Sequence, residues 1–194
     1  MKNLTESLAS ADAKRPESMK NTDTARVFFA LWPQATIQSQ LHAVAKEYQA
    51  KCNARVMRAD TLHMTLQFIG NIKRSQLPEL IKAADKVSAL PPFKLELNTL
   101  SFWKHNRIGY ATLAASEPLL DTLAASLQHE LVNAGFITDN AKFSPHVTLL
   151  RNVEQALQMQ DFPAIKWRID SFVLVESEIT EKGAHYKILK EWPL

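Results

Sequence analysis

Apolar and polar residues follow two periods along this chain, and each period predicts a type of secondary structure. Alternation at every second position, as in residues 62–68, is typical of a strand with one buried face. Apolar residues three and four positions apart, as in residues 37–48, are typical of a helix packed on a core. The pattern predicts strands at residues 27–32, 62–68, 93–97, 107–113, 142–151, 167–176 and 185–189. It predicts helices at residues 37–48, 75–89 and from Glu117 to the stop signal at Gly135.

Two passages repeat one order of elements: a strand, a helix, and a strand that contains a His-x-Thr-Leu sequence. The first passage ends in the strand at residues 62–68 and the second in the strand at residues 142–151. Duplication of one unit explains this repeat, and no linker rich in Gly, Pro or Ser divides the halves. We therefore expect one two-lobed domain over residues 25–194. Residues 1–24 carry little that is large and apolar, and we expect them to be a mobile extension.

Composition and charge narrow the classes of function. Hydrophobic residues make up 46% and charged residues 22% of the 194 residues, as in a globular protein. No apolar run reaches the roughly 18–20 residues of a membrane span, and no secretory signal is evident, so we expect a cytoplasmic location. The single cysteine, Cys52, excludes a disulfide within the chain and a zinc site of several thiolates. The net charge of +3 permits a phosphate-bearing partner without demanding one.

The most informative residues are two copies of one motif, His63-Met64-Thr65-Leu66 and His146-Val147-Thr148-Leu149. The chain has only six histidines, so composition does not explain two copies in matching positions. Residues i and i+2 of a strand point to the same face, so each histidine shares a face with the threonine of its own motif. The apolar residues of the motifs point the opposite way, toward the core. The duplication then allows the two His–Thr pairs to meet across a cleft.

Two facing imidazoles suit acid–base catalysis, because histidine titrates near pH ~6.5 and one ring can be neutral while the other is protonated. Phosphodiester cleavage needs a base and an acid on opposite sides of phosphorus, and threonine hydroxyls can hold the non-bridging oxygens. A cyclic phosphodiester fits this apparatus well, since its ring strain lowers the activation that is required. Candidates for further substrate contacts are Arg107 and Arg151 for phosphate, and Phe29 and Trp103 for stacking on a base.

Other interpretations of these residues are weaker. A lone histidine on a strand is usually structural, and it is the duplicate that favours a function. Two histidines without a carboxylate or thiol cluster argue against a metal site, so we expect neither metal nor cofactor. Ser144 lacks the Gly-x-Ser-x-Gly elbow of a nucleophile, and Cys52 has no Cys-x-x-Cys partner.

The paired motifs resemble the hallmark of the 2H phosphoesterase superfamily. The surrounding sequence resembles its bacterial RNA 2′,3′-cyclic phosphodiesterase branch, also called LigT-like 2′-5′ RNA ligases. Three further stretches fit that branch: Arg26-Val27-Phe28-Phe29-Ala30-Leu31, Phe143-Ser144-Pro145-His146-Val147-Thr148-Leu149-Leu150-Arg151, and the tail from Ser177 through Gly183 and Tyr186 to Trp192. The resemblance covers about residues 25–194. It implies a bilobal α/β (α+β) fold, in which two antiparallel sheets with helices outside form a V-shaped groove.

The same resemblance implies metal-independent hydrolysis of an RNA 2′,3′-cyclic phosphate to a 2′-phosphate. We expect a monomer that acts on RNA ends or related nucleotides and not at a membrane. It implies site roles by residue match: His63 as proton donor to the departing 3′ oxygen, His146 as the base that activates water, Thr65 and Thr148 as phosphate ligands, and Arg151 and Arg107 as basic contacts. Three alternatives stay open: ATP-independent 2′-5′ joining of tRNA halves, a small cyclic phosphate as substrate, and a nucleotide- or RNA-binding module without turnover.

Overall fold

Strands and helices together cover most of the described part of the chain, which comprises residues 23–138, 142–155, 158–180 and 183–194 of a computed structural model. The strands are β1 (Thr24–Leu31), β2 (Arg55–Val56), β3 (Met64–Lys73), β4 (Phe93–Trp103), β5 (Ile108–Leu113), β6 (Val147–Arg151), β7 (Gln160–Ile169), β8 (Ser171–Thr180) and β9 (Gly183–Pro193). The helices are α1 (Ala35–Cys52), α2 (Leu77–Ala84) and α3 (Pro118–Asn133), with short 3-10 helices η1 (Ala59–Thr61) and η2 (Arg74–Gln76). Among these residues no helix is long and apolar enough to cross a membrane. Most of the expected extension at residues 1–24 lies outside the described residues.

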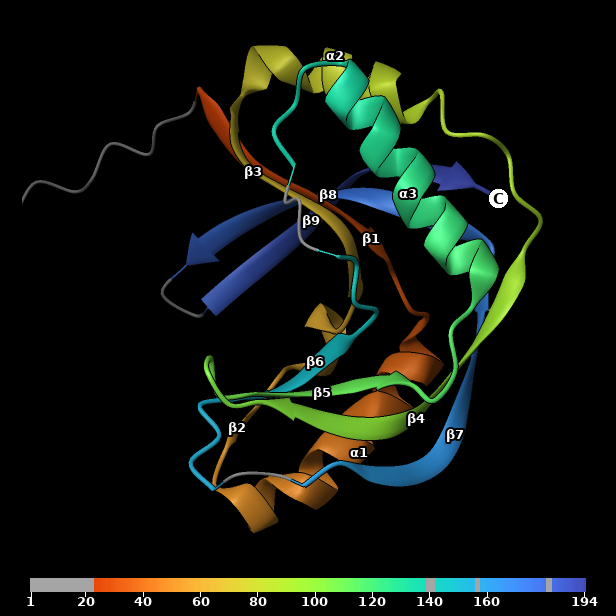
Figure 1. The fold of residues 1–194 in the computed structure, drawn as a ribbon. Coiled ribbons are helices and arrows are strands. Elements are labelled where there is room, and N and C mark those ends of the chain that lie inside the picture. The colour runs from red at the N-terminus through yellow and green to blue at the C-terminus, as the bar shows by residue number, and fades with distance from the viewer. Residues whose placement is uncertain (1–22, 139–141, 156–157, 181–182) are drawn as a thin grey trace, which may run out of the picture.

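The nine described strands form one antiparallel sheet in the order β7-β4-β5-β6-β3-β1-β8-β9, with β2 paired to β6 beside this path. The expectation of two separate sheets is therefore corrected, although the sheet has two matching halves. One half is β7-β4-β5-β6 and the other is β3-β1-β8-β9, and they join only where Met64 pairs with Val147. Figure 1 shows the two halves one above the other. A joint of one residue pair leaves each half free to take its own direction.

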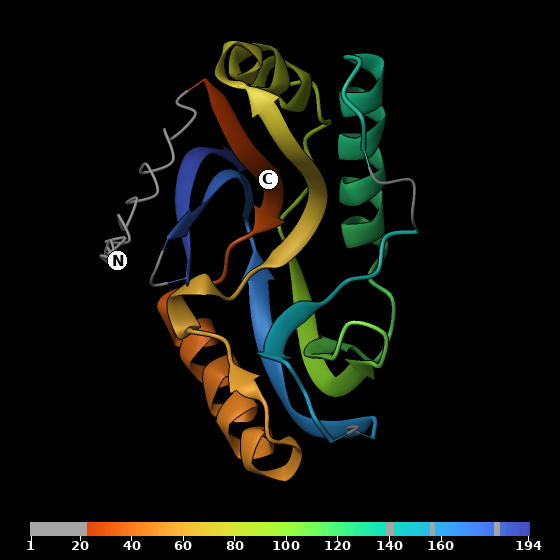
Figure 2. The ribbon, with the colours of Figure 1, turned by 90° about the vertical axis from the view of Figure 1, so that its left-hand side faces the viewer.

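The expected duplication is present as β1–α1–β3 in the first unit and β5–α3–β6 in the second. Each of these helices crosses to the motif strand of the other unit, because α1 contacts β6 and β7 while α3 contacts β3 and α2. Figure 2 shows α1 at one end of the molecule and α2 and α3 at the other. The helices thus bind the two units into one body and support both motif strands from behind.

Several element boundaries differ from those that the apolar pattern predicted, and three of the differences have a clear structural cause. The strand expected at residues 62–68 continues to Lys73, because Gly70 takes a φ of +84° at a bulge between β1 and β3 and does not end the pairing. The single strand expected at residues 167–176 is two strands, β7 and β8, because the chain crosses at Asp170 from one half of the sheet to the other. The helix expected at residues 75–89 starts as η2 and its α-helical part ends at Ala84.

Strand β1 directs two adjacent aromatic rings to opposite faces of the sheet. Phe29 points into the core and is completely buried, with its ring centroid 5.8 Å from that of Trp192 and 6.4 Å from that of Phe172. The expectation that Phe29 contacts the substrate is therefore wrong. Its neighbour Phe28 lies on the opposite face of β1, toward the motif histidines.

Truncation of Phe29 tests this assignment to the core. We expect Phe29→Ala to lower the free energy of unfolding in urea by about 3–5 kcal/mol, because the lost ring leaves a cavity. The control Ile137→Ala, at a side chain that is 89% exposed, changes it by less than about 0.5 kcal/mol. Wild-type stability in Phe29→Ala would contradict the assignment. If that variant does not fold, Phe29→Leu gives the same test with a smaller loss.

Candidate active site

The pairing of β3 with β6 sets the geometry of the two motifs. Met64 pairs with Val147, and both side chains are completely buried. Neighbours of a pair in an antiparallel ladder also face each other. One residue to either side of this pair, the histidine of each motif lies opposite the threonine of the other motif. His63 faces Thr148, and His146 faces Thr65. These four residues, the His–Thr quartet, lie on the face of the sheet opposite to Met64 and Val147.

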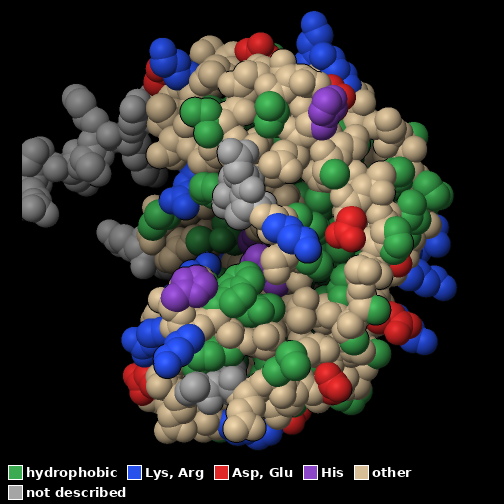
Figure 3. All heavy atoms as spheres, in the orientation of Figure 1, with side chains coloured by type: hydrophobic (Ala, Val, Ile, Leu, Met, Phe, Trp, Pro, Cys, Tyr) green, Lys and Arg blue, Asp and Glu red, His purple; other side chains and the backbone are tan. Residues whose placement is uncertain are grey.

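The His–Thr quartet lines one cavity of about 240 Å³, the central cavity. Arg26 and Phe28 of β1, Arg151 at the end of β6 and Tyr186 of β9 complete much of its wall. Figure 3 shows the surface hollowed between the two halves of the sheet, with histidine side chains in the hollow. Both histidines, both threonines and Arg151, all expected from the sequence as site residues, are therefore brought to one place.

The two imidazoles are held in the same way by the backbone. Nδ1 of His63 lies 2.8 Å from the carbonyl oxygen of Thr61, and Nδ1 of His146 lies 2.8 Å from the carbonyl oxygen of Ser144. A carbonyl oxygen only accepts a hydrogen bond, so Nδ1 of each ring donates it and carries a hydrogen. Nε2 of each neutral ring is then the unprotonated nitrogen. Each Nε2 is left to exchange a proton with a bound molecule.

Aromatic side chains pack around both imidazoles, but in different arrangements. His63 is stacked on Phe28 and on Trp32, with ring centroids 4.8 and 5.2 Å apart, and the edge of Tyr186 approaches it at 5.2 Å. His146 makes only edge contacts, with Trp103 at 4.5 Å and with Tyr110 at 5.7 Å. These rings fix the orientation of each imidazole and keep water from much of its surface.

Two arginines bring positive charge to the wall of the central cavity. Arg151 directly follows the second motif, at the end of β6. Arg26 comes from β1, and its guanidinium lies over the ring of Phe68, 5.0 Å from the centroid. An anion in the cavity would therefore lie among the His–Thr quartet and two guanidinium groups, an arrangement typical of phosphate binding.

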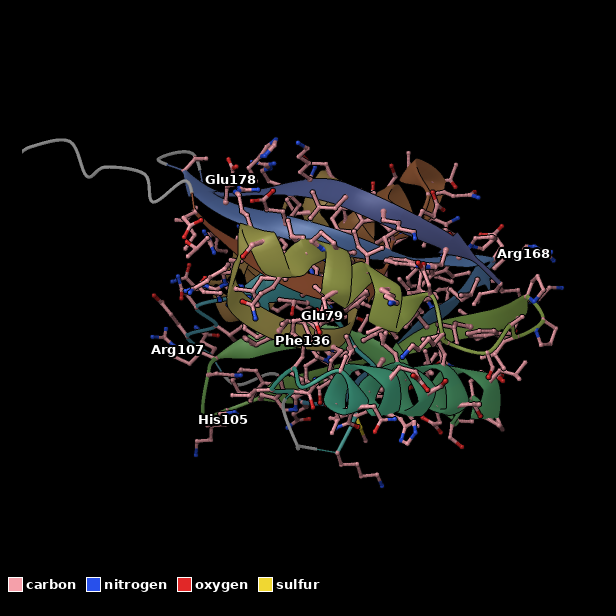
Figure 4. The ribbon with its side chains drawn as sticks, turned by 90° about the horizontal axis from the view of Figure 1, so that it is seen from above. Glu79, His105, Arg107, Phe136, Arg168 and Glu178 are labelled. Carbon is pink, nitrogen blue, oxygen red and sulfur yellow. The ribbon has the colours of Figure 1, made fainter. Side chains whose placement is uncertain are left out.

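Arg107, the other arginine expected to contact the substrate, is not part of this wall. It occupies the turn between β4 and β5 with a positive φ of 57°. Its Nε donates to the carbonyl oxygen of Val153 at 2.9 Å and its Nη2 to that of Asn152 at 3.4 Å. Figure 4 shows Arg107 and His105 at the same end of the molecule. Arg107 therefore fastens the loop after β6, and the expectation of a phosphate contact is corrected.

Burial controls the protonation of the two imidazoles. Removal from water lowers the pKa of His63 to about 4, and the positive charges of His146 and Arg151 add to this effect. Burial also lowers the pKa of His146, with a further contribution from Arg151. The hydrogen bonds to Thr61 and Ser144 oppose the shift without cancelling it. Both rings are therefore neutral at pH 7 while the cavity holds no anion.

Metal ligands are not gathered in the described part of the chain. Within residues 23–138, 142–155, 158–180 and 183–194, no group of three or more His, Cys, Asp or Glu side chains is placed to hold a metal ion. The acid–base groups of the central cavity are thus the two imidazoles, accompanied by hydroxyls and guanidinium groups.

Comparison with known proteins finds one group of relatives. A family model described as LigT like Phosphoesterase matches residues 31–110, which include the first motif. The chain is 29% identical over 172 residues to the RNA 2′,3′-cyclic phosphodiesterase of Escherichia coli K12, an alignment that covers 87% of this chain and 96% of that protein. It is 25% identical over 182 residues to the protein of the same name from Aquifex aeolicus. The chain is thus similar to LigT-like phosphoesterases over most of its length.

The fold agrees with this similarity to LigT-like proteins. The crystal structure of Escherichia coli LigT in apo form superimposes with a TM-score of 0.78 at 28% identity, covering 89% of this chain and 99% of that one. A crystal structure of Escherichia coli LigT complexed with 3′-AMP gives a TM-score of 0.77 over the same shares of the two chains. The α+β architecture expected from the sequence is confirmed.

Several residues of this LigT-like site were not singled out from the sequence. Arg26 and Phe28 could have been found, because the polar Arg26 fixes which positions of β1 face the same way as Phe28. Trp32 and Tyr186 carry no comparable signal: each reaches His63 through tertiary structure alone. Trp103 was considered only as a platform for a base, and it packs against His146.

The protonation of the two histidines can be measured directly. We expect side-chain ¹⁵N NMR to show a pKa of about 4 for His63 and a pKa below 6.5 for His146, with both neutral rings protonated on Nδ1. Arg151→Gln raises the pKa of both rings because it removes a positive charge beside them, whereas the control Arg107→Gln leaves them unchanged. Unshifted pKa values, or neutral rings protonated on Nε2, would contradict this description.

Proposed function

We propose that this protein hydrolyses the 2′,3′-cyclic phosphate at the end of an RNA to a 2′-phosphate, using its own side chains and no metal ion. The observation that carries the proposal is the His–Thr quartet, in which two imidazoles with free Nε2 atoms and two hydroxyls line one small cavity. Such a site offers a base, an acid and hydrogen-bond donors to one tetrahedral group.

The reaction is a displacement at phosphorus. Nε2 of His146 takes a proton from water as the water oxygen bonds to phosphorus, and the bond from phosphorus to the 3′ oxygen breaks. Nε2 of His63 gives its proton to the departing 3′ oxygen, so the phosphate stays on the 2′ oxygen. The hydroxyls of Thr65 and Thr148 donate hydrogen bonds to the non-bridging oxygens, where negative charge grows. His146 then releases its proton to solvent and His63 takes one up, which resets the pair.

The substrate itself supplies the charge that the acid requires. Both rings are neutral at pH 7 without an anion, because burial lowers the pKa of each imidazole. A phosphodiester carries one negative charge, which favours a protonated imidazole beside it and raises that pKa. Arg151 and Arg26 also bind this anion, but they do not donate a proton, so one imidazole must still be protonated. Substrate binding and protonation of the acid are therefore coupled.

His63 is the ring that we assign as the acid. The resemblance to LigT-like enzymes gives it this role, and because burial lowers its pKa to about 4, it takes up the proton only beside a bound anion. Its faces are stacked on Phe28 and Trp32, and aromatic faces attract a cation. His146 receives only edge contacts and is better suited to start as the neutral base.

The relatives support a nucleotide as substrate. The proteins of Escherichia coli and Aquifex aeolicus that align with this chain are named RNA 2′,3′-cyclic phosphodiesterase. Crystal structures of Escherichia coli LigT hold 3′-AMP, ATP or phosphate. The alignments span both motifs, and the proposal extends the activity in those names to this chain.

Replacing either imidazole tests the proposal. We expect His63→Ala and His146→Ala each to reduce kcat for an oligoribonucleotide ending in a 2′,3′-cyclic phosphate by about 10²–10⁴-fold, because each removes one proton-transfer group. The control His129→Ala, at an exposed position of α3, leaves kcat unchanged. Wild-type turnover in either cavity variant would contradict the mechanism.

The product and the metal requirement complete this test. The wild-type product should carry its phosphate on the 2′ oxygen, which ³¹P NMR distinguishes from a 3′-phosphate. Activity should persist in excess chelator. A 3′-phosphate product would contradict the assigned leaving group, and tight RNA binding without any product would favour a binding module.

A further inference from the structure

A second hollow lies beside the central cavity. It has a volume of about 690 Å³, against about 240 Å³ for the central cavity. Thr65, Phe68 and His146 line both, so the two spaces share a wall at the His–Thr quartet. We call the second space the side groove; the residues that characterise it are Trp103, His105, Asn106, Ala125 and Lys142.

We propose that the side groove binds the RNA strand next to the cyclic phosphate, and that the protein thereby prefers RNA ends to free cyclic mononucleotides. The inference rests on the proposed function and adds to it the class of substrate. The central cavity is smaller than the roughly 300–1,000 Å³ of typical ligand pockets, whereas the side groove lies within that range. A terminal phosphate and its ribose fill the first space, and only a longer ligand reaches the second.

The walls of the side groove match single-stranded RNA. Trp103 lines the side groove, with its ring held against Tyr110 at a centroid distance of 4.2 Å and against His146 at 4.5 Å. A half-buried indole fixed in this way offers a platform for one base. Because Trp103 lies beside His146, a base stacked on Trp103 would lie next to the phosphate that His146 contacts.

Polar and charged groups extend from this platform. Lys142 and His105 are exposed, and Lys142 adds a positive charge for a backbone phosphate, while Asn106 offers amide hydrogen bonds to a base edge. Asp121 of α3 contributes a carboxylate on the same wall. One lysine near one carboxylate favours a short strand with few phosphate contacts over a long electrostatic footprint.

The floor of the side groove is formed by small residues of α3. Ala125 is exposed there, and Ala124 lies beside it. A bulky side chain at position 125 would fill the groove without touching the His–Thr quartet. The same substitution at Ala43, an exposed alanine of α1 outside both spaces, is a matched control.

The test compares two substrates in one set of variants. For the wild type we expect a higher kcat/KM on a short oligoribonucleotide ending in a 2′,3′-cyclic phosphate than on a 2′,3′-cyclic mononucleotide. Ala125→Phe lowers kcat/KM for the oligonucleotide by roughly five- to one-hundredfold, the effect of one lost stacked base, and leaves the mononucleotide unchanged. Ala43→Phe changes neither. Equal rates on both substrates in the wild type, or equal losses in Ala125→Phe, would overturn the proposal.

A salt series tests the contribution of Lys142. Lys142→Gln should reduce the slope of log(kcat/KM) against log salt for the oligonucleotide by about 0.7, the effect of one phosphate contact to a single strand. The control Lys46→Gln, on the exposed face of α1, leaves the slope unchanged. An unchanged slope in Lys142→Gln would remove this residue from the proposed strand contact.

Binding separates failure of the side groove from failure of the proposed function. Fluorescence anisotropy with a short single-stranded RNA measures affinity without turnover. If no cyclic phosphate is hydrolysed but Ala125→Phe weakens RNA binding, the side groove stands and the proposed hydrolysis fails. If hydrolysis proceeds and Ala125→Phe binds RNA as the wild type does, the side groove is overturned and the proposed function stands.

Discussion

The site depends on one antiparallel contact, the pairing of Met64 in β3 with Val147 in β6. Both side chains are completely buried and bind the two halves of the sheet through the core. Their polar neighbours must then emerge together on the other face, because strand side chains alternate. A slip of either strand by one residue would turn the His–Thr pair of that strand toward the core. The same contact therefore joins the halves and assembles the chemistry.

Burial links this geometry to reactivity. The aromatic rings that orient His63 and His146 also withdraw them from water, and desolvation disfavours the charged imidazole. The backbone carbonyls of Thr61 and Ser144 fix which nitrogen is available. Without a bound anion, the central cavity is thus lined by two neutral imidazoles and two guanidinium groups. It is completed by an anion that restores one proton to the pair, as a phosphodiester does.

Much of the site could be predicted from the sequence because it repeats. The His-x-Thr-Leu motifs fixed both the residues and the face they share, and the order of strand, helix and strand indicated a duplicated unit. Phe29 was misassigned because the continuous apolar run after Arg26 shows no alternation of its own. Arg107 and Arg151 each lie at one end of an expected strand, and only the fold shows that Arg107 binds the carbonyl oxygens of the loop after β6.

The remaining features depend on contacts that no local pattern encodes. The sequence indicated two lobes, but the single residue pair that makes their strands one sheet is a tertiary event. The crossing at Asp170 interrupts an apolar pattern that runs without a break through β7 and β8. Tyr186 approaches His63 because β9 pairs with β8 at the edge of the sheet, far from either motif in the sequence.

A crystal structure with a bound nucleoside 2′-monophosphate measures most directly whether both imidazoles serve one phosphorus atom. We expect phosphate oxygens within about 2.6–3.2 Å of Nε2 of both His63 and His146, with both Nδ1–carbonyl hydrogen bonds intact. The threonine hydroxyls should contact the remaining oxygens. A phosphate that touches only one imidazole, or that binds outside the central cavity, would contradict this expectation.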